Sequence, residues 1–257
     1  MPLIEFRNVY KAFGPKVIYA GLNLNIERGE ALTIVGGSGV GKSDMLKMLI
    51  GLLKVDRGEI IFDGENLEVM KDRELAKVRQ RIGMLFQGAA LFDSLSVREN
   101  VAYGLREHYH MTEDEIAERV AWALSLVGLP GVEAMAPADL SGGMKKRVGL
   151  ARTIALKPEV LLYDEPTTGL DPINTTRINN LIMSLQKALG VTSIVVTHDM
   201  GSAFTISTRL AMVYKGRIVA SGTPDEFKTT NNPLVRNFIE GNAPEGDNIE
   251  ALVARQA

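Results

Sequence analysis

The sequence predicts an α/β fold with a parallel core sheet, an N-terminal antiparallel β subdomain and a helical insertion at about residues 88–156. The first supporting observation is segment 31–35, which is almost continuously apolar, as is typical of a strand buried in a parallel sheet. The second is the alternation of apolar segments at 160–163 and 192–196 with a helical pattern at about 173–189. Such alternation indicates a parallel sheet covered by helices.

The predicted antiparallel subdomain occupies about the first 65 residues. Apolar residues at positions 22, 24 and 26 alternate with Asn23 and Asn25, which is the period of a half-buried strand. Asp63-Gly64 follows a short apolar segment and is typical of a hairpin turn. In the helical insertion, two serine or threonine residues stand three positions before a glutamate, which is the spacing of a capping box. These pairs are Ser96 with Glu99 and Thr112 with Glu115.

Composition excludes several classes of protein. The 257 residues are 46% hydrophobic and 23% charged, which is ordinary for a globular chain and argues against disorder. The absence of cysteine excludes a disulfide scaffold and thiolate chemistry. A net charge of −2 argues against a dedicated nucleic-acid binder. The sequence shows neither a signal peptide nor the roughly 20 apolar residues of a membrane helix, so we expect any membrane role to require a partner.

A glycine-rich segment after the strand at 31–35 predicts a phosphate-binding loop. It matches the pattern G-x-x-x-x-G-K-[ST] and leads into a helical segment, and this context separates it from a glycine-rich turn without a ligand. Backbone N–H groups and the positive end of the helix dipole favour phosphate oxygens, the lysine places a charge on the outer phosphates, and the hydroxyl can hold Mg²⁺. The matching residues are Gly36, Gly37, Ser38, Gly39, Val40, Gly41, Lys42 and Ser43.

Two carboxylates end the apolar strand at 160–163. Asp164 is predicted to reach the Mg²⁺ shell, which leaves Glu165 to orient or polarise the attacking water as a general base. His198 follows the strand at 192–196, at the carboxyl end where open α/β sheets bind ligands, so it is a candidate for contact with the γ-phosphate. The alternatives are a solvated acidic pair and a structural histidine.

The segment Leu140-Ser141-Gly142-Gly143-Met144 opens a second predicted helix. Ser141 can cap it, and the glycines would expose N–H groups at its positive end, which makes a second anion site. Because one phosphate loop already covers one nucleotide, we hypothesise that this second site faces a nucleotide held by another chain. The alternative is an ordinary serine-capped helix.

Together these motifs resemble the nucleotide-binding subunit of ABC transporters over residues 3–240, including a helical subdomain at about 88–156. Leu140–Met144 resembles the family's signature loop, although Met144 stands where glutamine is commoner. The resemblance implies a role for each matching residue. Gln87 would lie in the Q-loop and bind Mg²⁺ together with Ser43 and Asp164, and Asp171 would lie in the D-loop. His198 would be the switch histidine, and Phe13 the adenine-stacking aromatic. The alternative for Phe13 is a core or turn aromatic.

The resemblance also implies ATP and Mg²⁺ as cofactors and a head-to-tail homodimer. In that dimer each ATP lies between the phosphate loop of one subunit and Ser141, Gly142 and Gly143 of the other. One phosphate loop and one signature segment are present in this chain, so two chains are needed.

Segments 83–95 and 141–173 resemble the ATPases of bacterial Mla/MCE-type phospholipid transport systems. That resemblance implies an integral-membrane permease, an MCE-type lipid-binding protein, a possible accessory subunit, and a place on the cytoplasmic face of the inner membrane. Leu91, Phe92 and Leu95 would then receive the permease, or else pack in the core. The rival hypotheses are an ABC ATPase for another small substrate, such as an amino acid, and a non-transport ABC protein.

Two features depart from the pattern or lie outside it. Asp44 stands where the family usually has threonine or serine, so a carboxylate would lie near phosphate. We expect it to weaken nucleotide affinity unless Mg²⁺ or a neighbouring cation offsets the charge. In the polar tail, 241–257, apolar residues at 249, 252 and 253 suggest a short helix that docks on a partner, with a frayed tail as the alternative.

Overall fold

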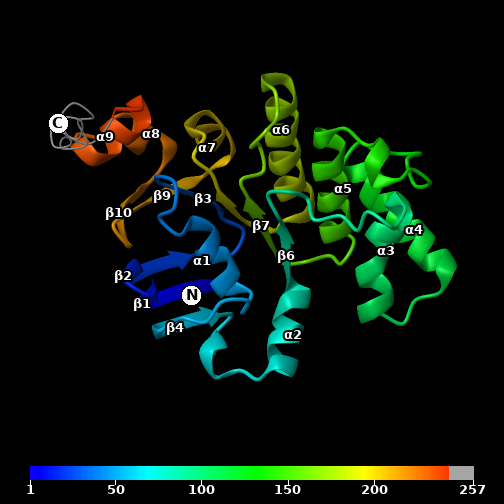
Figure 1. Cartoon of the computed structure of the whole chain (residues 1–257), viewed down its shortest axis with the longest axis horizontal. Coiled ribbons are helices and arrows are strands. Elements are labelled where there is room, and N and C mark those ends of the chain that lie inside the picture. The colour runs from blue at the N-terminus through cyan, green and yellow to red at the C-terminus, as the bar shows by residue number, and fades with distance from the viewer. Residues whose placement is uncertain (243–257) are drawn as a thin grey trace, which may run out of the picture.

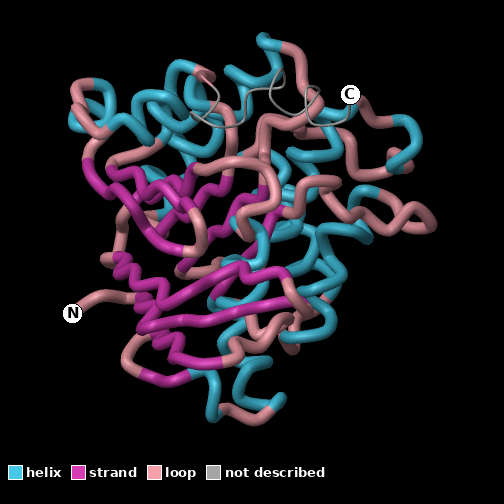
Figure 2. The backbone as a smooth tube through the Cα atoms, turned by 60° about the vertical axis from the view of Figure 1, so that its left-hand side comes forward, coloured by secondary structure: helices cyan, strands magenta, loops and turns pink. Residues whose placement is uncertain are grey.

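A computed structural model of the chain describes residues 1–242. Its N-terminal part is a four-stranded antiparallel sheet in the order β2-β1-β4-β5, as the sequence predicts. In Figure 2 the strands gather toward the N-terminal side of the view and the helices flank them. The strands of this sheet are β1 (Ile4–Phe13), β2 (Lys16–Ile26), β4 (Arg57–Phe62) and β5 (Glu65–Asn66).

The second sheet has six strands in the order β10-β9-β3-β8-β7-β6. The five strands from β9 to β6 pair in parallel, and β10 joins the edge antiparallel to β9. The predicted parallel core is therefore confirmed. The strands are β3 (Ala31–Val35), β6 (Ile82–Leu85), β7 (Val160–Asp164), β8 (Thr192–Val196), β9 (Arg209–Tyr214) and β10 (Arg217–Gly222).

Helices cover both faces of this sheet, and α3, α4 and α5 gather on the side away from β1 and β2 (Figure 1). Both predicted capping boxes form, at the starts of α3 and α4. The helices are α1 (Lys42–Leu49), α2 (Asp72–Arg81), α3 (Val97–His108), α4 (Glu113–Leu126), α5 (Gly142–Ile154), α6 (Pro172–Leu189), α7 (Met200–Ile206), α8 (Pro224–Lys228) and α9 (Pro233–Glu240), with 3₁₀ turns at Leu67–Val69 and Pro137–Asp139.

Strand β7 shows how the sheet divides two hydrophobic cores. Val160 and Leu162 face a core shared with α1 and the antiparallel sheet. Leu161 and Tyr163 face a core shared with α3 to α6. Because successive side chains of a strand point to opposite faces, a continuous apolar segment can fill both cores. Both faces of the strand are therefore buried, and its polar residues can only follow at its end.

The antiparallel sheet is joined to the core sheet at the turn between β9 and β10. Ala20 N donates to Gly216 O over 3.0 Å, and Arg217 Nε donates to Ala20 O over 3.0 Å. This contact places β1 and β2 beside the loop that follows β3. Within residues 1–242, no helix combines the length and hydropathy that membrane crossing requires. The tail helix suggested for 249–253 lies outside the described residues.

The loop before α3 is organised by Asn100, a fully buried side chain of that helix. Its Nδ2 donates to Phe92 O, Leu95 O and Ser96 O over 3.0–3.1 Å, and its Oδ1 accepts from Phe92 N over 2.8 Å. The loop holds Phe92 43% exposed against Tyr103, with ring centroids 4.9 Å apart. Core packing therefore does not account for Phe92.

We predict that Asn100→Ala lowers the free energy of unfolding by about 2–3 kcal/mol, because the buried backbone groups of the loop lose their partner. Asn180→Ala, at an exposed position of α6, is the matched control and should change stability by less than about 0.5 kcal/mol. Denaturant unfolding of both variants measures the difference. Equal midpoints for the two variants would show that Asn100 does not hold the loop.

Candidate active site

The predicted phosphate-binding loop follows β3 and ends where α1 begins at Lys42. Three of its glycines have conformations that other residues rarely adopt, with φ of 153° at Gly36, 71° at Gly39 and 97° at Gly41. A Cβ at Gly36 would overlap the carbonyl oxygen of Val213, and a Cβ at Gly41 would overlap the side chain of Ile18. The glycines are therefore needed for the close packing of this loop against β2 and β9.

Lys42 lies with only 7% of its surface exposed. Its Nζ donates to Gly36 O over 2.8 Å and to Gly37 O over 2.9 Å, so the ammonium is held inside the loop. Burial lowers the pKa of Lys42, and the charges of Glu165 and Asp164 act in the opposite direction. This arrangement places a desolvated positive charge where phosphate oxygens would enter.

Ser43 and Asp164 are brought together from α1 and the end of β7. Ser43 Oγ donates to Asp164 Oδ1 over 2.6 Å. Burial raises the pKa of Asp164, and the hydrogen bond from Ser43 acts against that rise. Gln87 lines the same cleft. A hydroxyl, a carboxylate and an amide oxygen are ligands that Mg²⁺ accepts beside phosphate, so these residues fit the metal that the sequence predicts.

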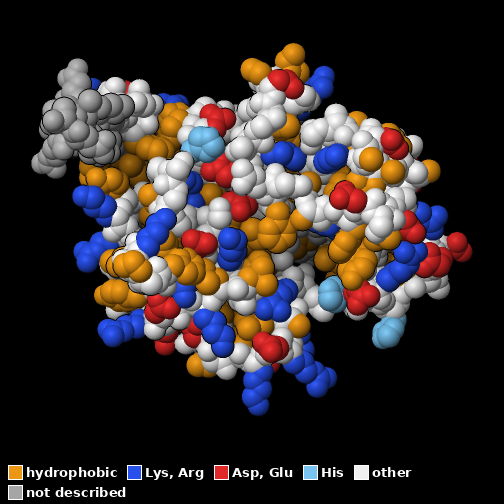
Figure 3. All heavy atoms as spheres, viewed as in Figure 1, with side chains coloured by type: hydrophobic (Ala, Val, Ile, Leu, Met, Phe, Trp, Pro, Cys, Tyr) orange, Lys and Arg blue, Asp and Glu red, His pale blue; other side chains and the backbone are white. Residues whose placement is uncertain are grey.

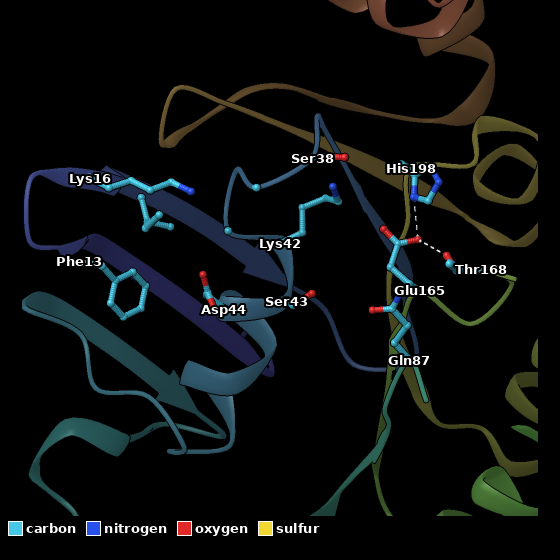
Figure 4. Close-up of a pocket in the computed structure, with 13 residues that line it drawn as sticks. Phe13, Lys16, Ser38, Lys42, Ser43, Asp44, Gln87, Glu165, Thr168 and His198 are labelled. Atoms are coloured by element: carbon cyan, nitrogen blue, oxygen red, sulfur yellow. Dashed lines mark hydrogen bonds and ion pairs between the residues drawn. The ribbon is translucent and has the colours of Figure 1, made fainter. Parts of the chain in front are cut away.

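Glu165 occupies the residue after β7 and has a φ of 49°, a left-handed conformation that is uncommon outside glycine. Its carboxylate lies 2.9 Å from His198 Nδ1 and accepts a hydrogen bond from Thr168 Oγ1 over 3.0 Å. Figure 4 shows Glu165, His198 and Thr168 pointing toward one another on the side of the cleft that faces Lys42. The predicted base and the predicted γ-phosphate contact are thus adjacent.

Lys42, Ser43, Gln87, Glu165 and His198 line one cleft of about 380 Å³, and Asp164 lies behind Ser43, to which it is hydrogen-bonded. Phe13 lies at the opposite end of it, 46% exposed, so the core alternative for this residue is wrong. Lys16, Ile18 and Thr168 also line the cleft, and sequence reasoning missed them because an alternating strand and a single threonine give no distinctive signal. The cleft is lined by Phe13, Lys16, Ile18, Ser38, Gly39, Gly41, Lys42, Ser43, Asp44, Gln87, Glu165, Thr168 and His198.

The predicted signature residues and Asp171 do not line this cleft. Ser141 caps α5 and accepts from Met144 N over 3.3 Å, as predicted. Of the two glycines, Gly142 is exposed, whereas Gly143 is buried against Asn174 of α6, so only one of them is open as expected. Asp171 caps α6 and accepts from the backbone N–H groups of Ile173 and Asn174 over 3.0 Å. These hydrogen bonds lower the pKa of Asp171.

The face seen in Figure 3 carries acidic and basic side chains interspersed over its surface.

The loop around a buried lysine, the hydroxyl–carboxylate pair and the carboxylate–histidine pair lie together at the carboxyl ends of parallel strands. This combination defines a P-loop nucleoside triphosphatase.

Comparison with known proteins narrows this class. A family model described as "ABC transporter" matches residues 19–168. The chain is 46% identical to the chloroplast protein TRIGALACTOSYLDIACYLGLYCEROL 3 of Arabidopsis thaliana, over 93% of this chain and 74% of that one. It is 42% identical to the intermembrane phospholipid transport system ATP-binding protein MlaF of Haemophilus influenzae, over 93% of this chain and 90% of that one. A solved dimeric structure of the ATP-binding cassette MJ0796 with ADP and Pi is 33% identical. It superposes with a TM-score of 0.79, over 86% of this chain and 98% of that one.

The chain belongs to the ABC transporter family. Its nucleotide is ATP and its reaction is ATP hydrolysis.

Asp44 lines the cleft, and its carboxylate lies 3.6 Å from Lys47 Nζ on the same helix. Lys47 is therefore a neighbouring cation that partly offsets the charge near phosphate. We predict that Asp44→Thr binds ATP about threefold to tenfold more tightly, because a repelling charge is removed. Lys47→Met should weaken binding, since it leaves the Asp44 charge without its partner.

Titration with MgATP at low and moderate salt measures both effects, which salt should reduce because the groups are partly exposed. Unchanged or weaker binding by Asp44→Thr would contradict the repulsion argument.

Proposed function

We propose that this chain is the ATP-hydrolysing subunit of an ABC transporter that energises phospholipid transport between inner and outer membranes with an MCE-type system. The observation that carries the proposal is the cleft that joins Lys42, the Ser43–Asp164 pair and the Glu165–His198 pair. The name of the MlaF relative, at 42% identity over 93% of this chain, supports phospholipid as the cargo.

The residues of the cleft divide the work of hydrolysis among them. Phe13 offers a ring for the adenine, and Lys42 with the loop N–H groups binds the phosphates. Ser43, Gln87 and Asp164 hold Mg²⁺, which when bound neutralises charge on the phosphate oxygens. Glu165 orients the attacking water and accepts its proton, and His198 contacts the γ-phosphate.

The signature residues, which lie outside the cleft, complete the site in a homodimer. In the proposed head-to-tail dimer the exposed Ser141 and Gly142 of one subunit face the ATP held by the other, with Gly143 buried behind them, and Asp171 lies at the same interface. The dimeric arrangement of the solved cassette supports this assembly. ATP binding then closes the dimer and hydrolysis reopens it.

The remaining parts of the system follow from the same proposal. An integral-membrane permease binds the ATPase at its helical subdomain, where Phe92 is exposed beside Leu91 and Leu95. An MCE-type lipid-binding protein and a possible accessory subunit complete the complex. The ATPase then sits peripherally on the cytoplasmic face of the bacterial inner membrane.

We predict that Glu165→Gln binds MgATP with near-normal affinity but hydrolyses it at least about 100-fold more slowly, because the positioning contacts remain and the base is lost. The variant should accumulate as a closed dimer in gel filtration with ATP. Lys42→Ala is the contrasting variant and should lose ATP binding itself. Brisk turnover by Glu165→Gln would refute the role of this residue.

The cargo is tested with the chain purified together with its native membrane partners. We predict that mass spectrometry finds phospholipid in the complex, and that phospholipid vesicles stimulate its ATPase activity relative to detergent alone. A complex that instead contains a binding protein for an amino acid, and whose ATPase activity ignores lipid, would establish the rival hypothesis of another small substrate.

A further inference from the structure

Lys146 is a buried cation to which the reaction described above assigns no role. It lies in the second turn of α5, and only 7% of its surface is exposed. Lysine is almost never fully buried unless its charge is paired or hydrogen-bonded. Burial lowers the pKa of Lys146, and the negative charge of Glu165 acts against that shift. Its surroundings therefore include the proposed base of the reaction.

The ammonium of Lys146 contacts the backbone of the loop between β7 and α6. Nζ donates to Thr168 O over 2.9 Å and to Glu165 O over 3.3 Å. The same Glu165 O accepts from Thr168 N over 3.3 Å, which closes a tight turn. Lys146 thus ties together the two ends of a turn whose first residue is Glu165.

This turn has a backbone conformation that needs external support. Glu165 has a φ of 49°, and strained conformations of this kind persist only where the surroundings over-determine them. From the strand side, Glu165 N donates to Val196 O over 2.9 Å. From inside the turn, Thr168 Oγ1 donates to the Glu165 carboxylate. From α5, Lys146 Nζ donates to the carbonyls of Glu165 and Thr168.

We propose that Lys146 is a positioning residue for Glu165, which holds the turn from Glu165 to Thr168 so that the carboxylate is directed into the cleft. The inference rests on the proposed role of Glu165 in hydrolysis. Lys146 also connects the turn after β7 with the signature residues of the same chain, because α5 begins at those residues, which face the partner's ATP in the proposed dimer. When the start of α5 contacts the partner's ATP, a displacement of this helix would reach Glu165 of the same chain through Lys146.

The test is steady-state ATPase kinetics of the full-length chain in complex with its membrane partners. Lys146→Met removes the donor while keeping most of the side-chain volume. We expect kcat to fall about 10- to 100-fold, as for other misplaced catalytic groups, and KM for MgATP to change less than about twofold. Lys146→Arg keeps a charged donor and should retain most of the activity. Lys187→Met, at an exposed position of α6, controls for the loss of a lysine charge.

A double-mutant cycle separates positioning from a general structural role. In the Glu165→Gln background, Lys146→Met should lower the residual rate no further, because the carboxylate that it positions is absent. An equal fold loss in both backgrounds, or a parallel loss of ATP binding and thermal stability, would overturn the proposal. Wild-type turnover by Lys146→Met would also overturn it.

If Lys146→Met yields no soluble complex, the same cycle is run with Lys146→Leu, which also removes the donor, and the same criteria apply. If Glu165→Gln alone retains normal turnover, the proposed role of Glu165 fails and the inference about Lys146 fails with it, whereas failure of the Lys146 variants alone leaves the role of Glu165 intact.

Discussion

The parallel hydrogen bonding of β3, β8 and β7 is the constraint on which the site depends. Ile34 of β3 and Asp164 of β7 both pair with Val196 of β8, so the three strands end at the same level. The phosphate-binding loop, Glu165 and His198 each begin within two residues of that level. A shift of one strand by a single residue would move its whole side-chain set to the opposite face and separate these groups. The register thus makes one cleft from three segments that are far apart in sequence.

Electrostatic balance is the second requirement of this cleft. Asp164 and Glu165 are adjacent carboxylates, and Lys42 and Lys146 are buried ammonium groups near them. Both ammonium groups donate to backbone carbonyls, Lys42 within its own loop and Lys146 to the turn after β7. These hydrogen bonds offset the desolvation that burial of a charge imposes. The two lysines come from α1 and α5, so the carboxylates at the end of β7 are flanked by two helices that pack on different cores of the sheet.

Helix α5 links the loops around the site as well as carrying the signature residues at its start. Near its end, Arg152 donates to the carbonyl of Ala90 over 2.7 Å and to that of Ala89 over 2.9 Å. Both alanines have positive φ and follow Gln87 closely. One rigid helix therefore contacts the segment after Gln87, the turn after Glu165 and, in the proposed dimer, the nucleotide of the partner.

The sequence by itself determined the α/β class, the phosphate-binding loop, the acidic pair and the capped helices of the insertion, because each is encoded by residues close together in the chain. It did not indicate α2, which carries only two buried side chains, Leu75 and Val78, and so has a weak apolar pattern. The contributions of Lys16, Thr168 and Lys146 were decided by the tertiary structure alone. Their side chains act through atoms distant in sequence, and a lysine in a helix has the same local pattern whether it points to solvent or to a buried carbonyl. Only the packing of α5 against the turn after β7 determines which of the two occurs.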